Sequence, residues 1–79
     1  IEEIISNLEI GPNPASNYLF LNNGGNQVFN VVIFNSLGQE AGSMELKPHT
    51  DNTLDISSYS PGIYMIYSNG LFAKKFVVH

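Results

Sequence analysis

Five residues in the second half of the sequence are of the types that hydrolases use. His49, Asp51 and Asp55 lie close to Ser57 and Ser58, and together they supply the base, carboxylate and hydroxyl of a catalytic triad. A triad, however, depends on a scaffold that brings the three groups together in space, and the same residue types are common in turns. The sequence therefore favours turn residues over a hydrolytic site, and we expect this chain not to be an enzyme.

The sequence offers no convincing site for a metal ion or cofactor. Asp51, Asn52 and Asp55 carry oxygen ligands for calcium, but the segment lacks the dense carboxylate run and the glycine of a dedicated loop. Nothing that could begin a helix follows Gly24 and Gly25, so they do not form a phosphate-binding loop. The absence of cysteine rules out a thiolate site and a disulfide. We therefore expect no cofactor and no metal.

Carbohydrate binding is a function that the sequence leaves open. Asn22, Asn23 and Asn26 could form hydrogen bonds with sugar hydroxyls, and an exposed Tyr18 or Tyr59 could stack on a sugar ring. Turn formation and core packing explain the same residues without a ligand. An adhesive or carbohydrate-binding β-sandwich therefore remains the alternative hypothesis.

Length and charge limit the remaining classes. A chain of 79 residues with 43% hydrophobic content is expected to form one domain over residues 1–79. Residues 1–11 would be a lead-in strand or the end of a linker, and residues 12–79 the core. The net charge of −4, with three lysines and no arginine, argues against nucleic acid as a partner. No apolar run is long enough for direct membrane insertion, and because the sequence begins at Ile1 we expect a fragment of a longer protein.

Alternating apolar residues predict an all-β fold. Short apolar runs separated by Gly, Pro, Asn and Ser clusters recur about every ten residues. This spacing is typical of an antiparallel, immunoglobulin-like β-sandwich of about seven strands. The segment from Gln27 to Asn35 should be a central strand covered on both faces. The other expected strands are Glu3 to Ile10, Tyr18 to Leu21, Gln39 to Leu46, Asn52 to Ile56 and the two strands of a hairpin from Gly62 to His79, with a turn at Asn22 to Asn26.

The final hairpin is the clearest local prediction. Asn69 and Gly70 form the dipeptide that best tolerates the two positive φ angles of a type I′ turn. The last strand should then lie at a sheet edge, where unpaired backbone groups and two adjacent lysines can meet a partner. The predicted facing pairs are Tyr67 with Phe72, Met65 with Lys74 and Ile63 with Phe76 on one side, and Ile66 with Ala73 and Tyr64 with Lys75 on the other.

Three sequence blocks, taken in order, resemble a known family. They are residues 12–17 around a Pro-Asn-Pro motif, residues 31–39 with a strand and a glycine turn, and residues 56–66, which resemble a Leu-x-x-Gly-x-Tyr block. A pair of lysines before a final β-branched run follows them. From about Leu8 to His79 the sequence thus resembles the C-terminal sorting domain of the type IX secretion system.

The resemblance implies a secretion signal in folded form. Such a domain is a β-sandwich at the C-terminus of a cargo protein, recognised by the type IX translocon and its shuttle proteins. It directs the cargo through the periplasm and across the outer membrane, to the cell surface or the extracellular space. A sortase-like cysteine protease usually removes it, and cleavage before Ile1, cleavage within residues 1–11 and no cleavage all remain open.

The resemblance also suggests which residues matter. We expect the translocon to recognise the last strand, and the family motif residues to act mainly through the fold, with Gly62 supplying a backbone conformation or close packing and Tyr64 a buried anchor. Two positions depart from the family pattern: Gly11 replaces an aromatic residue, and His79 stands where a lysine or arginine is common. The expected recognition residues are Lys74, Lys75, Phe76, Val77, Val78 and His79, and the motif residues are Pro12, Asn13, Pro14, Gly38, Pro61, Gly62 and Tyr64.

Overall fold

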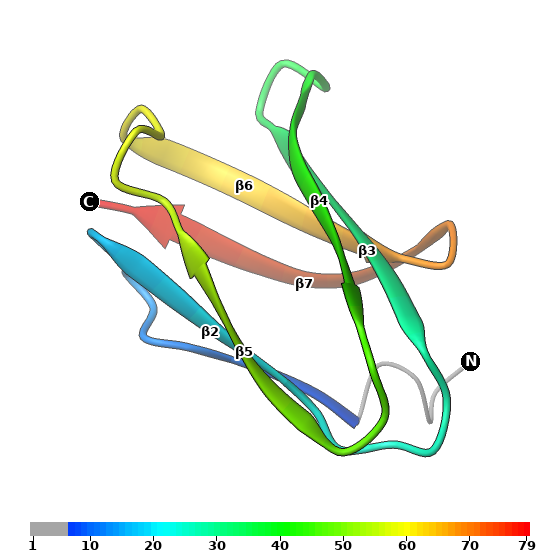
Figure 1. Cartoon of the computed structure of the whole chain (residues 1–79). Helices are drawn as coiled ribbons and strands as arrows, with labels where there is room; N and C mark the ends of the chain where they lie inside the picture. The colour runs from blue at the N-terminus through cyan, green and yellow to red at the C-terminus, as the bar shows by residue number, and fades with distance from the viewer. Residues whose placement is uncertain (1–6) are drawn as a thin grey trace.

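The computed structural model describes residues 7–79, which form two antiparallel sheets packed as a β-sandwich (Figure 1). This confirms the predicted all-β, seven-stranded fold. One sheet has the order β1-β2-β5 and the other the order β4-β3-β6-β7. No helix within these residues is long and apolar enough to cross a membrane. The strands are β1 (Leu8–Gly11), β2 (Tyr18–Asn23), β3 (Phe29–Asn35), β4 (Glu40–Leu46), β5 (Thr50–Asp55), β6 (Gly62–Ser68) and β7 (Leu71–Val78).

The core lies between the two sheets and is built from alternate residues of each strand. Phe29 and Phe76 are the largest fully buried side chains. Burying a side chain of this kind stabilises the fold by about 1.5–3 kcal/mol. The other buried apolar residues are Leu8, Ala15, Leu19, Leu21, Val31, Ile33, Leu46, Ile56, Tyr64, Ile66, Ala73 and Val78.

Strand β3 is central, as predicted, because it pairs with β4 on one side and β6 on the other. Its inward residues Val31 and Ile33 are buried. The expectation that both faces would be covered is wrong, since Val32 and Phe34 on the outer face are only half-buried. The sandwich has two layers, so the outer face of the four-stranded sheet is open to solvent.

The turn of the final hairpin has the predicted form. Asn69 and Gly70 have φ angles of 53° and 83°, and Ser68 pairs with Leu71 across the two-residue loop. These positive angles are those of a type I′ turn.

The predicted register of the hairpin is correct only next to the turn. Tyr67 does face Phe72, but a β-bulge then leaves Ala73 as an extra residue, so Ile66 pairs with Lys74. A bulge shifts every later pair by one residue, and periodicity alone does not reveal it. The observed pairs beyond it are Met65 with Lys75, Tyr64 with Phe76 and Ile63 with Val77.

Two N-terminal predictions change in their bounds. The first strand was expected over Glu3 to Ile10, and it is described only for Leu8–Gly11; residues 3–6 lie outside the described residues. The expected turn at Asn22 to Asn26 is wrong for its first two residues, which extend β2.

Asn23 is a buried polar residue with a structural role. Its Nδ2 donates to the carbonyl oxygens of Gln27 and Leu46 at 2.8 and 3.0 Å, and its Oδ1 accepts from the amide of Gly25 at 2.9 Å. The side chain is completely buried. It therefore ties the turn after β2 to the end of β4 and satisfies backbone groups that would otherwise lack partners.

Replacing Asn23 should be costly. Asn23→Ala removes three hydrogen bonds and leaves buried carbonyl groups unsatisfied, so we expect the free energy of unfolding to fall by about 2–4 kcal/mol. Urea denaturation measures this change. Asn30→Ala, at an exposed asparagine of β3, is the matched control and should stay within about 0.5 kcal/mol of the unmodified domain. Equal losses for both variants would contradict the assigned role.

Candidate functional site

The residues considered for catalysis take part in separate contacts. His49 Nε2 lies 2.7 Å from Asn26 Oδ1, and Asp51 accepts a hydrogen bond from Asn22 Nδ2 at 2.6 Å. The histidine and the aspartate are thus each paired with an asparagine. Nothing in these contacts resembles the ordered nucleophile, base and carboxylate of a triad.

Asp55 is likewise engaged locally. Its Oδ1 accepts hydrogen bonds from the hydroxyl of Ser57 at 2.7 Å and from its amide at 2.9 Å. These two bonds, the hydroxyl first, lower the pKa of Asp55 because they stabilise the carboxylate. This is an exposed turn that closes on itself. Among the described residues, no three histidine or acidic side chains gather as metal ligands.

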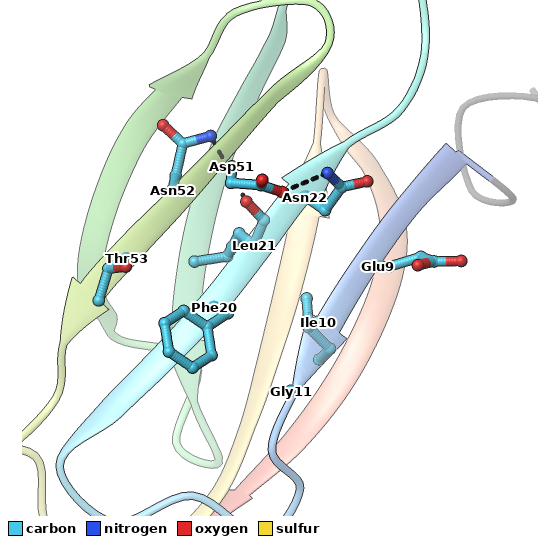
Figure 2. A pocket seen from close by; sticks show the side chains of 9 residues that line it. All are labelled: Glu9, Ile10, Gly11, Phe20, Leu21, Asn22, Asp51, Asn52 and Thr53. Carbon is cyan, nitrogen blue, oxygen red and sulfur yellow. Dashed lines mark hydrogen bonds between the residues drawn. The ribbon is translucent and has the colours of Figure 1, made fainter.

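A shallow hollow of about 470 Å³ lies on the outer face of the three-stranded sheet (Figure 2). Phe20, which is 58% exposed, projects beside it. Asn22 and Asp51 also line the hollow, but their amide and carboxylate are hydrogen-bonded to each other. Asn23, one of the proposed sugar-binding residues, is buried in the fold. The contacts in this hollow therefore do not favour a carbohydrate site.

Tyr59, the other expected stacking residue, is half-buried rather than exposed. Its hydroxyl donates to the carbonyl of Ala41 at 3.4 Å, and its ring lies 5.2 Å from that of Tyr64. Burial, followed by the proximity of Tyr64, raises the pKa of Tyr59. Tyr59 thus packs against the end of the core, whereas Tyr18 remains 54% exposed.

The predicted recognition residues are the end of β7, the strand at one border of the four-stranded sheet, and His79 directly after it (Figure 1). Phe76 and Val78 point into the core and are buried. Lys75 and Val77 are exposed, as is His79 just beyond the strand, while Lys74 is half-buried. The last strand therefore has one face that holds the sandwich together and another that solvent reaches.

The edge of β7 that points away from β6 is hydrogen-bonded to residues 13–15. Asn13 Oδ1 accepts from the amide of Val77 at 3.0 Å, and Asn13 Nδ2 donates to the carbonyl of Lys75 at 3.3 Å. The amide of Ala15 donates to the carbonyl of Val77, and the carbonyl of Ala15 accepts from the amide of His79, both at 2.8 Å. We call Asn13 to Ala15 the edge clasp.

The edge clasp corrects the expectation of unpaired backbone groups at this border. From Lys75 to His79, the carbonyl groups and amides that point away from β6 are hydrogen-bonded to the edge clasp. Pro12 and Pro14 have no amide hydrogen to offer an adjacent strand. The side-chain amide of Asn13 takes the place of a peptide group, which explains why an asparagine between two prolines can lie against a strand.

Two motif glycines have backbone roles. Gly38 has a φ of 82° in the turn between β3 and β4, and its amide donates to the carbonyl of Asn35 at 3.0 Å. Gly62 begins β6 with a φ of 150°. A Cβ at either position would meet no atom within 4 Å. Backbone conformation, rather than close packing, therefore accounts for glycine at both positions.

Tyr64 links the turn before β6 to the terminal strand. Its hydroxyl donates to the carbonyl of Ser60 at 2.7 Å, and its ring stacks on Phe76 with centroids 5.4 Å apart. The side chain is 6% exposed. Pro61 lies exposed in the turn between these residues. Tyr64 thus packs directly against the strand predicted to be recognised.

Ala15 belongs to the block of residues 12–17, but its structural role was not predicted. Its side chain is 1% exposed, and its backbone forms a parallel bridge with Val78. Its small size directly after the Pro-Asn-Pro motif was the one available signal, since only a small side chain allows close approach of two backbones. The pairing partner, 63 positions away, leaves no trace in local sequence.

Comparison with known proteins gives one family. The family model described as a secretion system C-terminal sorting domain matches residues 9–79. No curated protein and no solved structure gives a significant match to this chain. The matched region contains the edge clasp, the motif glycines, Tyr64 and the whole of β7.

The edge clasp should respond to a single substitution. Asn13→Ala removes two exposed hydrogen bonds, so we expect a loss of about 0.5–1.5 kcal/mol in the free energy of unfolding. Hydrogen exchange of the Val77 amide should accelerate, because that amide loses its acceptor. NMR-detected exchange measures the rate, with Ser16→Ala in the same loop as the control. An unchanged Val77 rate in Asn13→Ala would mean that the clasp does not protect this edge in solution.

Proposed function

Because the chain belongs to the family of secretion system C-terminal sorting domains, we propose that the type IX secretion machinery recognises it through the terminal hairpin formed by β6 and β7. Members of this family are sorting signals and not enzymes. The chain is thus a type IX secretion sorting signal that interacts with the secretion system. The protein that carries it goes to the cell surface or the extracellular space.

The family match over residues 9–79 is the observation that carries this proposal. The hairpin is supported as the recognised element by its place at a sheet border and by its exposed side chains. Two of the three lysines of the chain, Lys74 and Lys75, are on β7. In a domain with a net charge of −4, they make this strand the place where a partner meets positive charge.

The finer steps of the route are part of the proposal. The carrier protein crosses the periplasm, meets the translocon and its shuttle proteins, and loses the domain to a sortase-like cysteine protease. Residues 8–11 pair with β2, and a protease needs an extended, accessible backbone. We therefore place the cleavage ahead of Leu8.

Carbohydrate binding remains without a supporting contact. A glycan-binding module would bind sugars as an isolated domain and would work at any position in a longer chain. The asparagines considered for that role hydrogen-bond within the domain instead. These contacts therefore favour no second function.

Removing most of the last strand should abolish export. We expect a cargo protein fused to the domain to be secreted, and the same fusion lacking residues 74–79 to be made but retained in the cell. Immunoblots of the cell and medium fractions measure this ratio. Normal secretion of the truncated fusion would contradict recognition through the hairpin.

A control is needed because the truncation also removes Phe76 and Val78 from the core. Leu19→Ala destabilises the opposite sheet by about 2–5 kcal/mol and leaves β7 intact. Export should persist in Leu19→Ala at a temperature at which the domain stays folded. Equal loss in both variants would mean that the machinery requires stability rather than this strand.

The position of cleavage gives a separate prediction. The released domain should begin at or before Leu8, since Leu8 and the three residues after it pair with β2. Mass spectrometry of the released fragment determines its first residue. A fragment that begins after Leu8 would show that the protease opens the first sheet.

A further inference from the structure

The outer face of the four-stranded sheet carries a continuous apolar surface. We call it the outer apolar face, and we define it by residues of β3, β6 and β7 that are exposed or half-buried. Monomeric proteins rarely leave a large contiguous apolar patch open unless it binds something. The apolar residues of this face are Val32, Phe34, Ile63, Met65, Tyr67, Phe72 and Val77.

Strand pairing makes this surface continuous. Phe34 lies opposite Met65, and Tyr67 lies between Val32 on one neighbouring strand and Phe72 on the other. The ring of Tyr67 contacts Phe34 and Phe72 edge-on, with centroids 5.5 and 5.8 Å apart. These rings form a row across three strands, next to a hollow of about 450 Å³.

Within the hairpin, the face is more available than the edge. The backbone groups from Lys75 to His79 that point away from β6 are already hydrogen-bonded to the edge clasp. An added strand would therefore have to displace the clasp. Ile63 and Phe72, by contrast, are 48% and 47% exposed on the outer face. A partner can therefore cover this face without breaking any backbone hydrogen bond.

Charge distinguishes the two borders of the face. Lys75 is exposed and lies directly opposite Met65, so this lysine is at the β7 border of the apolar row. Glu40 and Glu45 lie on β4, at the other border of the sheet. Since the apolar row is flanked by a cation where it meets the terminal strand, a complementary surface would place a carboxylate there.

We propose that the outer apolar face docks on an apolar protein surface of the secretion machinery that carries a carboxylate facing Lys75. This inference rests on the proposed function and specifies the surface and the chemistry of its partner. Phe72 and Ile63 would be buried in the contact, and Lys75 would pair along its β7 border. Burial of exposed aromatic and aliphatic side chains supplies most of the binding energy in such contacts.

Export of a reporter fused ahead of the full domain tests the proposal. Phe72→Ser and Ile63→Ser each remove an exposed apolar side chain and should lower secretion about tenfold. Lys75→Glu should do the same by placing a carboxylate against a carboxylate, and it leaves the core unchanged. The matched controls are Phe20→Ser on the outer face of the other sheet and Lys47→Glu, an exposed lysine between β4 and β5, and both should be secreted normally.

The outcomes separate this inference from the function on which it rests. Secretion of the unmodified fusion with retention of the three face variants supports both, provided that thermal unfolding shows each variant folded. Normal secretion of Phe72→Ser, Ile63→Ser and Lys75→Glu overturns docking through this face and leaves the sorting function intact. Failure of the unmodified fusion to leave the cell overturns both. Loss of secretion in Phe20→Ser equal to that in Phe72→Ser also overturns docking through this particular face.

Discussion

The backbone hydrogen bonds on the two sides of β7 are the constraint on which the rest of the structure depends. Along one edge, β7 pairs with β6 over its length. Along the opposite edge, the last residues of β7 are hydrogen-bonded to the edge clasp. An edge strand normally presents a row of unpaired amides and carbonyls that can join another chain. Here residues near the two ends of the chain close that row from Lys75 to His79.

Closing the edge changes what a partner can bind. An open edge offers backbone groups, which attract any extended peptide with little regard to sequence, whereas a face offers particular side chains. With the edge bonded to Asn13 and Ala15, β7 presents Lys75 and Val77 from its outer face while Phe76 and Val78 stay in the core. A sorting domain must be distinguished from many other β-sandwiches, and side chains on a face carry that information better than a backbone ladder.

Local patterns predicted the elements of this fold, and long-range contacts escaped them. The Asn69-Gly70 turn and the alternation in β3 depend on neighbouring residues, so they were correct. The bulge at Ala73 was not predictable, because one extra residue in a strand leaves the hydrophobic pattern nearly unchanged. Asn23 was expected in a turn because it stands among asparagines and glycines. Its burial depends on a contact with Leu46, 23 positions away, which local sequence does not reveal. The same holds for the candidate site: the lysines and the Pro-Asn-Pro motif were visible in the sequence, but their meeting at one strand edge was not.

The central claim is that residues 1–79 are sufficient to direct a passenger through the type IX machinery. The most direct measurement compares a periplasmic reporter, fused ahead of this domain, in a host with the intact machinery and in the same host with the translocon deleted. We expect the reporter to reach the cell surface or medium only in the intact host and to accumulate inside the cell envelope in the other. Equal distribution of the reporter in the two hosts would contradict a sorting function.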